Sequence, residues 1–157
     1  MLKLHLTLTV NGESRELLID PRQTLLDVLR DELDLRGAHR GFDSGDCGAC
    51  SVMLDGKLVT ACLVLAADCE GGGVLTVEGV APDGALHPVQ RTLVEQGGIQ
   101  CGFCTPGIVL AAVALLRSTP HPTEDEVRIG LAGNLCRCTG YKKIVEAVLS
   151  ASGEETR

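Results

Sequence analysis

Hydrophobic and polar residues alternate in the first part of the chain in the manner of β-strands. Residues 4–10 alternate with a period of two, and an Asn-Gly pair at 11–12 precedes an apolar return at 17–19. Because Asn-Gly tolerates the positive φ that a two-residue turn needs, these segments predict a β-hairpin. A second hairpin is predicted over 51–59 around an Asp-Gly turn, and a last strand over 74–77.

Two helices are predicted beside these strands. Thr24 starts the first, since an acidic residue stands three positions later and the apolar residues within 25–29 follow helical spacing. We expect this helix to lie across the sheet. A shorter apolar helix is predicted over 62–67, and a glycine-rich loop over 37–50. Together these elements predict an α+β domain over residues 1–78.

The second part of the chain has helical periodicity instead. It follows a linker at 79–85 and contains four predicted helices, over 87–96, 106–117, 123–131 and 141–151. Pro106 is placed at a first helical position, and Thr123 begins a capping box. Because the connections are short, we expect a compact four-helix domain over 86–157.

Composition narrows the range of partners. The chain has 157 residues and a net charge of −7, with two Phe, one Tyr and no Trp. It lacks the basic block and the aromatic platforms that nucleic-acid binding uses. The N-terminal segment lacks the features of a secretory signal, and no apolar run approaches the ~18–20 residues that span a bilayer. We therefore expect a cytoplasmic protein that binds neither nucleic acid nor membranes.

Eight cysteines are the main chemical signal. In a reducing cytosol, cysteines in this number favour metal binding or redox chemistry over a disulfide framework. Four of them stand before predicted helix starts, where free backbone N–H groups favour anionic sulfur. We call these four the helical-domain set: Cys101, Cys104, Cys136 and Cys138. Four thiolates without a nearby histidine suit either zinc or an iron–sulfur centre.

The first half carries an incomplete second group. The ferredoxin-domain set consists of Cys47, Cys50 and Cys62. The plant-type [2Fe-2S] spacing requires a further cysteine at position 42, where the chain has Phe42. Three outcomes are open: a cluster retained with another fourth ligand, a lost cluster with Phe42 filling part of its space, or a rearranged loop. Candidate fourth ligands are water and Asp43, Ser44, Asp46 and Cys69.

Four motifs carry a resemblance to a known family. They are GDCGACSVMLDG at 45–56, QCGFCTPG at 100–107, PTEDEV at 122–127 and GNLCRCTGYKKIVEA at 133–147. In this order and spacing, they resemble the small iron–sulfur subunit of the xanthine oxidase family of molybdenum hydroxylases. The resemblance extends from residue 2 to about residue 150.

The resemblance implies an N-terminal β-grasp, ferredoxin-like domain with one [2Fe-2S] cluster and a C-terminal helical domain with another. It implies that the helical-domain set binds the cluster nearer the molybdenum cofactor, and that the ferredoxin-domain set binds the second. In the family, the residues matching Gln100 and Cys138 contact the pterin of that cofactor. The implied partners are a large molybdopterin subunit and a medium FAD subunit, in a heterotrimer or a dimer of heterotrimers.

The function that this resemblance implies is electron transfer between the molybdopterin centre and FAD, with no substrate site on this chain. Two other functions remain open. One is a structural adaptor subunit stapled by zinc, and the other is a free-standing ferredoxin that serves diffusible partners. Iron–sulfur protein is brown and bleaches on reduction, whereas zinc protein is colourless.

Overall fold

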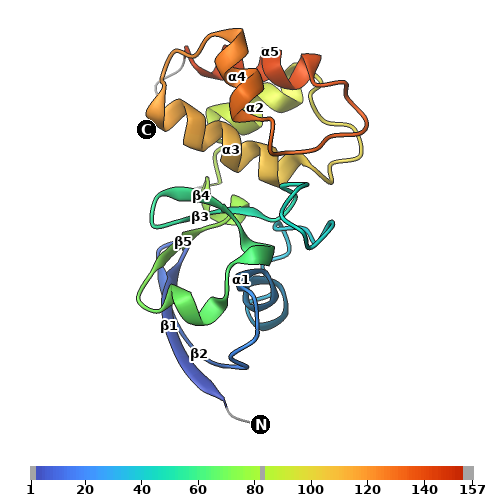
Figure 1. Ribbon diagram of the computed structural model, residues 1–157. Coiled ribbons are helices and arrows are strands. Elements are labelled where there is room, and N and C mark those ends of the chain that lie inside the picture. Colours follow the sequence, from blue (N-terminus) through green and yellow to red (C-terminus); the bar gives the residue numbers. More distant parts are fainter. Residues whose placement is uncertain (1–2, 82–83, 154–157) are drawn as a thin grey trace.

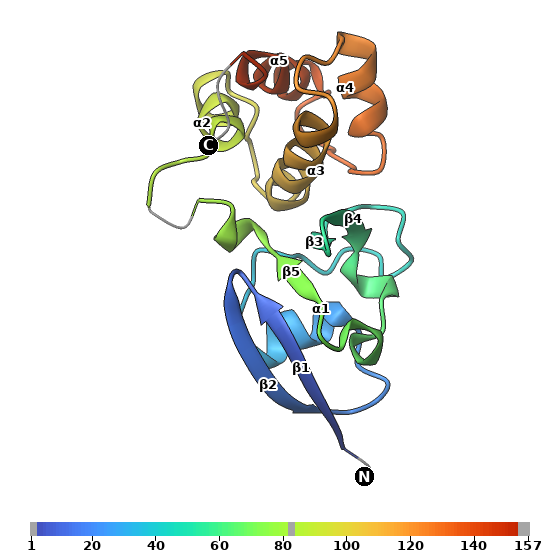
Figure 2. The same cartoon turned by 90° about the vertical axis from the view of Figure 1, so that its left-hand side faces the viewer.

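The computed structural model describes residues 3–81 and 84–153 of the chain. It consists of a sheet-containing part and a helical part, stacked one above the other (Figure 1 and, after a 90° turn, Figure 2). Residues 1–2, 82–83 and 154–157 lie outside the described ranges. The outer limits of both predicted domains and the middle of the predicted 79–85 linker therefore stay predictions.

Five strands form one mixed sheet in the order β2-β1-β5-β3-β4. The central pair, β1 and β5, is parallel, and the other neighbours are antiparallel. The sheet and the helices beside it confirm the predicted α+β class. The strands are β1 Leu4–Val10, β2 Glu13–Ile19, β3 Ser51–Leu54, β4 Lys57–Thr60 and β5 Gly73–Leu75.

Both predicted hairpins are confirmed, together with the turns that close them. Asn11 and Gly12 have φ values of 51° and 85°, and the Asp55-Gly56 pair has values of 48° and 78°. These are the left-handed conformations that a tight two-residue turn requires. Strand β2 begins earlier than the predicted return at 17–19, because its first residues are exposed and polar and carry no apolar signal.

The first predicted helix begins where expected. The Thr24 hydroxyl accepts from the Asp27 N–H, and the Asp27 carboxylate accepts from the Thr24 N–H. Only one turn, α1 Leu25–Asp27, is α-helical, and it continues as a π-helix over Val28–Glu32. The apolar side chains of this segment are fully buried in one core with the inner residues of β1, as the prediction of a helix lying across the sheet required.

Two details of the first half were predicted wrongly. The helix expected over 62–67 is two short 3₁₀ turns, Ala61–Leu63 and Ala66–Cys69, separated by an extended pair. The extended pair forms because the segment bonds to the start of the first helix, from Leu25 N–H to Val64 O at 2.7 Å. The last strand ends at Leu75, since the Thr76 N–H donates to the Asn11 side chain and a 3₁₀ turn follows.

The predicted four-helix bundle is confirmed. Its helices are α2 Pro88–Glu95, α3 Thr105–Ser118, α4 Glu124–Gly130 and α5 Lys142–Ala151. The Thr123 capping box forms as expected, whereas Pro106 is the second residue of its helix. Helix α3 is buried along most of its length, because it packs on α2 and α4 and also on β3 and β4 (Figure 1). Within residues 3–81 and 84–153, no helix has the length and apolar character needed to cross a bilayer.

Candidate metal centres

The helical-domain set comes from two loops at one end of the bundle. Cys101 and Cys104 precede α3, with Cys104 as its N-cap, and Cys136 and Cys138 lie in the loop between α4 and α5. Cys101 and Cys138 are exposed, whereas Cys104 and Cys136 are half-buried. The set therefore has an outer pair that faces solvent and an inner pair that faces the protein.

The thiols of this set change one another's pKa values. Burial raises the pKa of Cys104 to about 12, and a hydrogen bond to Cys136 and the charges of Cys136 and Cys101 add to the rise. A hydrogen bond to Cys101 likewise raises the pKa of Cys138. Cys104 thus lies against Cys136, and Cys101 lies against Cys138. A bound cationic centre would relieve this mutual opposition to ionisation.

The pairing of the thiols is compatible with an iron–sulfur centre. Within the described residues, no three His, Cys, Asp or Glu side chains converge on a point that could hold one metal ion. A [2Fe-2S] cluster distributes four thiolates over two irons. The pairs Cys104–Cys136 and Cys101–Cys138 each offer two neighbouring thiols for that arrangement.

A hydrogen-bonded loop supports the inner pair. Tyr141, with a left-handed φ of 67°, accepts at its hydroxyl from the Cys136 N–H at 2.8 Å and donates to Asn134 O at 2.9 Å. The Thr139 hydroxyl lies 3.1 Å from Cys136 Sγ. Burial opposes ionisation of Cys136, but hydrogen bonds from the Thr139 side chain and backbone outweigh it and lower the pKa. The loop thus prepares Cys136 as a thiolate ligand.

The ferredoxin-domain set is brought together in the interior. Its three residues are buried, with exposed fractions of 8% for Cys47, 2% for Cys50 and 9% for Cys62. Burial raises the pKa of Cys50 to about 11, and its interactions with Cys62 and Cys47 contribute. A Cβ added to Gly41 would lie 2.6 Å from Cys47 Sγ, so the loop carrying position 42 passes directly beside the set.

Position 42 supplies no cysteine ligand. Phe42 is 66% exposed, so the structure does not show the outcome in which Phe42 fills the vacated ligand space, one of the three left open. Of the candidate fourth ligands, Asp43 pairs with Arg40, and the Ser44 hydroxyl donates to Asp46. The buried Cys69 thiol donates to Leu65 O. Burial raises the pKa of Cys69, and the charges of Asp68 and Asp55 add to the rise. The site therefore presents three thiols for the four positions of a cluster.

The two sets meet across the seam between the domains. The Leu135 N–H, beside Cys136, donates to Cys47 O at 2.9 Å. The buried Asn134 amide donates to Gly48 O at 2.9 Å and to Ser51 Oγ at 3.2 Å. A Cβ on Gly48 would lie 2.3 Å from Gly133 O, so this approach of backbones requires glycine. One hydrogen bond thus connects Cys47, in one cysteine set, to the residue that precedes Cys136, in the other.

The predicted pterin contacts lie on the outer side. Gln100 is exposed, as are its neighbour Cys101 and Cys138. Sequence reasoning missed the residues that support the sets, namely Asn134, Thr139, Tyr141 and His39. Asn134, Thr139 and Tyr141 stand within the motif at 133–147, in which only the cysteines were given a role. No spacing rule could link Asn134 to Gly48, which is 86 residues away.

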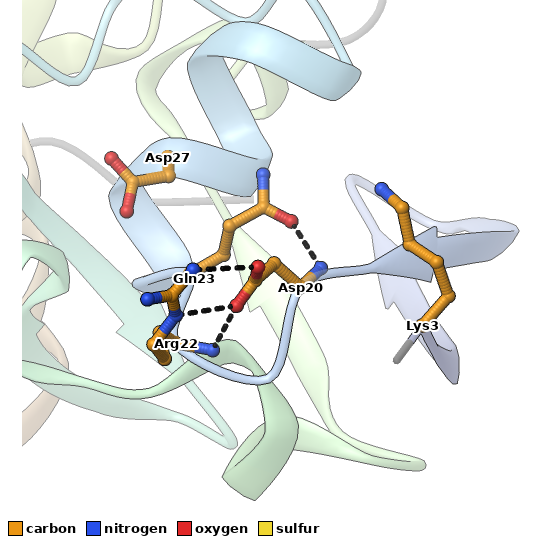
Figure 3. Close-up of a pocket in the computed structure, with 5 residues that line it drawn as sticks. All are labelled: Lys3, Asp20, Arg22, Gln23 and Asp27. Atoms are coloured by element: carbon orange, nitrogen blue, oxygen red, sulfur yellow. Dashed lines mark hydrogen bonds and ion pairs between the residues drawn. The ribbon is translucent and has the colours of Figure 1, made fainter. Parts of the chain in front are cut away.

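A polar pocket at the far end of the sheet domain is shown in Figure 3. The Asp20 carboxylate accepts two bonds from the Arg22 guanidinium, and the Gln23 amide accepts from the Asp20 N–H, whereas the Asp27 carboxylate accepts from Arg40, outside the pocket. The pocket contains none of the cysteines. It therefore adds nothing to the metal centres.

Comparison with known proteins agrees with this arrangement. Residues 76–149 match the family model of the [2Fe-2S] binding domain. The chain is 45% identical to the nicotinate dehydrogenase small FeS subunit of Eubacterium barkeri, with 94% of each chain covered. It is 46% identical to the nicotine 6-hydroxylase small subunit of Paenarthrobacter nicotinovorans, with 97% of this chain and 92% of that one covered.

Solved structures give the same result. Quinoline 2-oxidoreductase from Pseudomonas putida 86 superposes with a TM-score of 0.93 at 37% identity, covering 96% of this chain and 94% of that one. The aldehyde oxidoreductase of Desulfovibrio desulfuricans superposes with a TM-score of 0.91 at 46% identity, and 95% of this chain matches only 17% of that much longer one. The chain belongs to the family of small [2Fe-2S] subunits of molybdenum hydroxylases, which are subunits of oxidoreductase complexes.

Proposed function

We propose that this chain transfers electrons between a molybdopterin centre and FAD, both held by partner subunits. The observation that carries the proposal is the hydrogen bond that joins the two domains beside both cysteine sets, from the N–H of Leu135, next to Cys136, to Cys47 O. An iron–sulfur cluster, when bound, accepts and releases single electrons. The chain's own contribution is to hold two such centres in a defined relation.

The helical-domain set holds the cluster that faces the molybdopterin subunit. Its outer thiols, Cys101 and Cys138, are exposed, so a partner's cofactor has access to them. Gln100 is exposed beside Cys101, which supports its proposed contact, with Cys138, to the pterin. On the inner side, Cys136 directly follows Leu135, whose N–H donates to Cys47 O in the ferredoxin domain.

The ferredoxin-domain set retains a [2Fe-2S] cluster on Cys47, Cys50 and Cys62 with a fourth ligand that is not cysteine. The burial of all three thiols and the close approach of the Gly41 loop support retention. The fourth ligand is an oxygen donor from the loop, among Asp43, Ser44 and Asp46, or from water. Oxygen is a harder donor than thiolate, so this centre has an atypical potential and loses iron more readily.

The partners are a large molybdopterin subunit and a medium FAD subunit, assembled as a heterotrimer or a dimer of heterotrimers. Relatives at this level of similarity are named small subunits, as in nicotine 6-hydroxylase. The substrate site then lies on the large subunit. We place the complex in the cytoplasm.

Two cysteine variants test the proposal in the purified complex. Cys136→Ser removes a ligand of the helical-domain set, whereas Cys69→Ser changes a cysteine outside both sets. We expect Cys136→Ser to lose about two irons per chain and the matching EPR signal, and Cys69→Ser to keep both. Equal iron in both variants contradicts the ligand assignment. Copurifying chains without molybdenum or FAD contradict the proposed partners, and bound zinc without iron favours the structural adaptor.

A further inference from the structure

We propose that His39 is a positioning residue that raises the reduction potential of the centre held by the helical-domain set, by donating a hydrogen bond to the Phe103 carbonyl. The inference rests on the proposed function, since it requires a cluster on that set. His39 belongs to the loop before the ferredoxin-domain set, whereas Phe103 stands between two cysteines of the helical-domain set. The contact therefore links the two domains beside both centres.

The geometry determines which group donates. His39 Nδ1 lies 2.7 Å from Phe103 O. A carbonyl oxygen can only accept, so Nδ1 carries the hydrogen. The two rings also stack, with centroids 4.7 Å apart and an angle of 16° between their planes. The stack holds the imidazole in the orientation that the hydrogen bond needs.

The other end of His39 is anchored as well. Its backbone N–H donates to Ala49 O at 3.0 Å, and the buried Ala49 directly precedes Cys50. The imidazole is thus held from the ferredoxin-domain loop and reaches a residue 64 positions away. Such a link keeps the Phe103 carbonyl at a fixed place relative to both cysteine sets.

The peptide group that begins with the Phe103 carbonyl ends with the Cys104 N–H. This N–H belongs to the same residue as the Cys104 sulfur, so it lies within a few bonds of a cluster ligand. A donor on the carbonyl polarises the peptide group and strengthens its N–H as a donor, by roughly 10–30% for one bond in a chain. Stronger N–H bonds to sulfur favour the more negative, reduced cluster and so raise its potential.

Three variants of the full chain in its complex test the proposal. His39→Phe keeps an aromatic ring but removes the donor, and His39→Asn keeps an N–H donor at the same position along the side chain. His121→Phe makes the first change at an exposed site elsewhere. The measurements are iron per chain and the potential of the helical-domain cluster, from an EPR-monitored redox titration.

We expect His39→Phe to retain its iron and to lower the potential of this cluster. His39→Asn should keep most of the wild-type potential, and His121→Phe should leave the potential unchanged. An unshifted potential in His39→Phe overturns the inference. Equal shifts in both His39 variants also overturn it, because a side chain that keeps the donor would then do no better than one that lacks it. Loss of iron from His39→Phe overturns it as well. A wild-type chain without any iron–sulfur signal would instead contradict the proposed function itself.

Discussion

The Asn134 side chain joins the two domains, and its removal has a cost that follows from its contacts. Asn134 is 3% exposed and donates to Gly48 O and Ser51 Oγ across the seam. Asn134→Ala removes both bonds, each worth about 0.5–1.5 kcal/mol net. We expect the free energy of unfolding to fall by about 2 kcal/mol, which lowers the melting temperature by about 4–8 °C for a chain of this size.

Urea unfolding of the full chain, followed by circular dichroism, measures this loss. Gln96→Ala is the matched control, because it removes a carboxamide from an exposed position whose side chain makes a long hydrogen bond, 3.5 Å to Ser150 Oγ. The control should change the free energy of unfolding by less than about 0.5 kcal/mol. If Asn134→Ala costs no more than Gln96→Ala, the Asn134 contacts do not hold the seam.

Three further predictions concern the loops around the cysteines. Gly48→Ala should destabilise the chain by about 1–3 kcal/mol more than Gly71→Ala in the same urea assay, since both glycines have positive φ but only Gly48 meets a neighbouring backbone. Tyr141→Phe should cost about 1–3 kcal/mol through its two lost hydrogen bonds and should release iron faster to a chelator. Burial opposes ionisation of Asp27, but hydrogen bonds from Thr24 and Arg40 hold the pKa of this carboxyl below 3.8. The ionised Asp27 carboxylate therefore stabilises the fold above that pH, and this stabilisation is lost as the pH falls through the folded pKa. Asp27→Asn should therefore lower stability at pH 7 and flatten the decline measured below about pH 3.8.

Each of these has a clear contrary result. Equal costs for the two glycine variants would mean that φ strain alone is responsible. Iron release from Tyr141→Phe at the wild-type rate would remove the tyrosine from the support of Cys136. If the decline of stability below about pH 3.8 is the same in Asp27→Asn as in the wild type, the Asp27 carboxylate makes no stabilising contacts in the folded chain.

Local chemistry made much of the fold predictable. Asn11-Gly12 specifies a turn through its own φ preferences, and Thr123 caps a helix within four residues of itself, so neither depends on distant parts of the chain. The apolar run at 62–67 failed as a helix because its backbone pairs with the segment at 23–25, and hydrophobicity does not encode that pairing.

The candidate sites divide in the same way. Cysteine spacing predicted both sets, because ligands that share a centre recur at short intervals. Asn134 and His39 act on partners in the other domain and leave no periodic pattern. Position 42 shows a third case, since the spacing exposed the missing ligand, whereas only the structure placed Phe42 outside the site.

The most direct test of the central claim is the iron and acid-labile sulfide content of the wild-type complex, measured with EPR after dithionite reduction. Two centres on this chain predict about four irons, about four sulfides and two distinct signals per chain. About two irons with a single signal would contradict the retained centre on Cys47, Cys50 and Cys62, and zinc without labile sulfide would contradict electron transfer altogether.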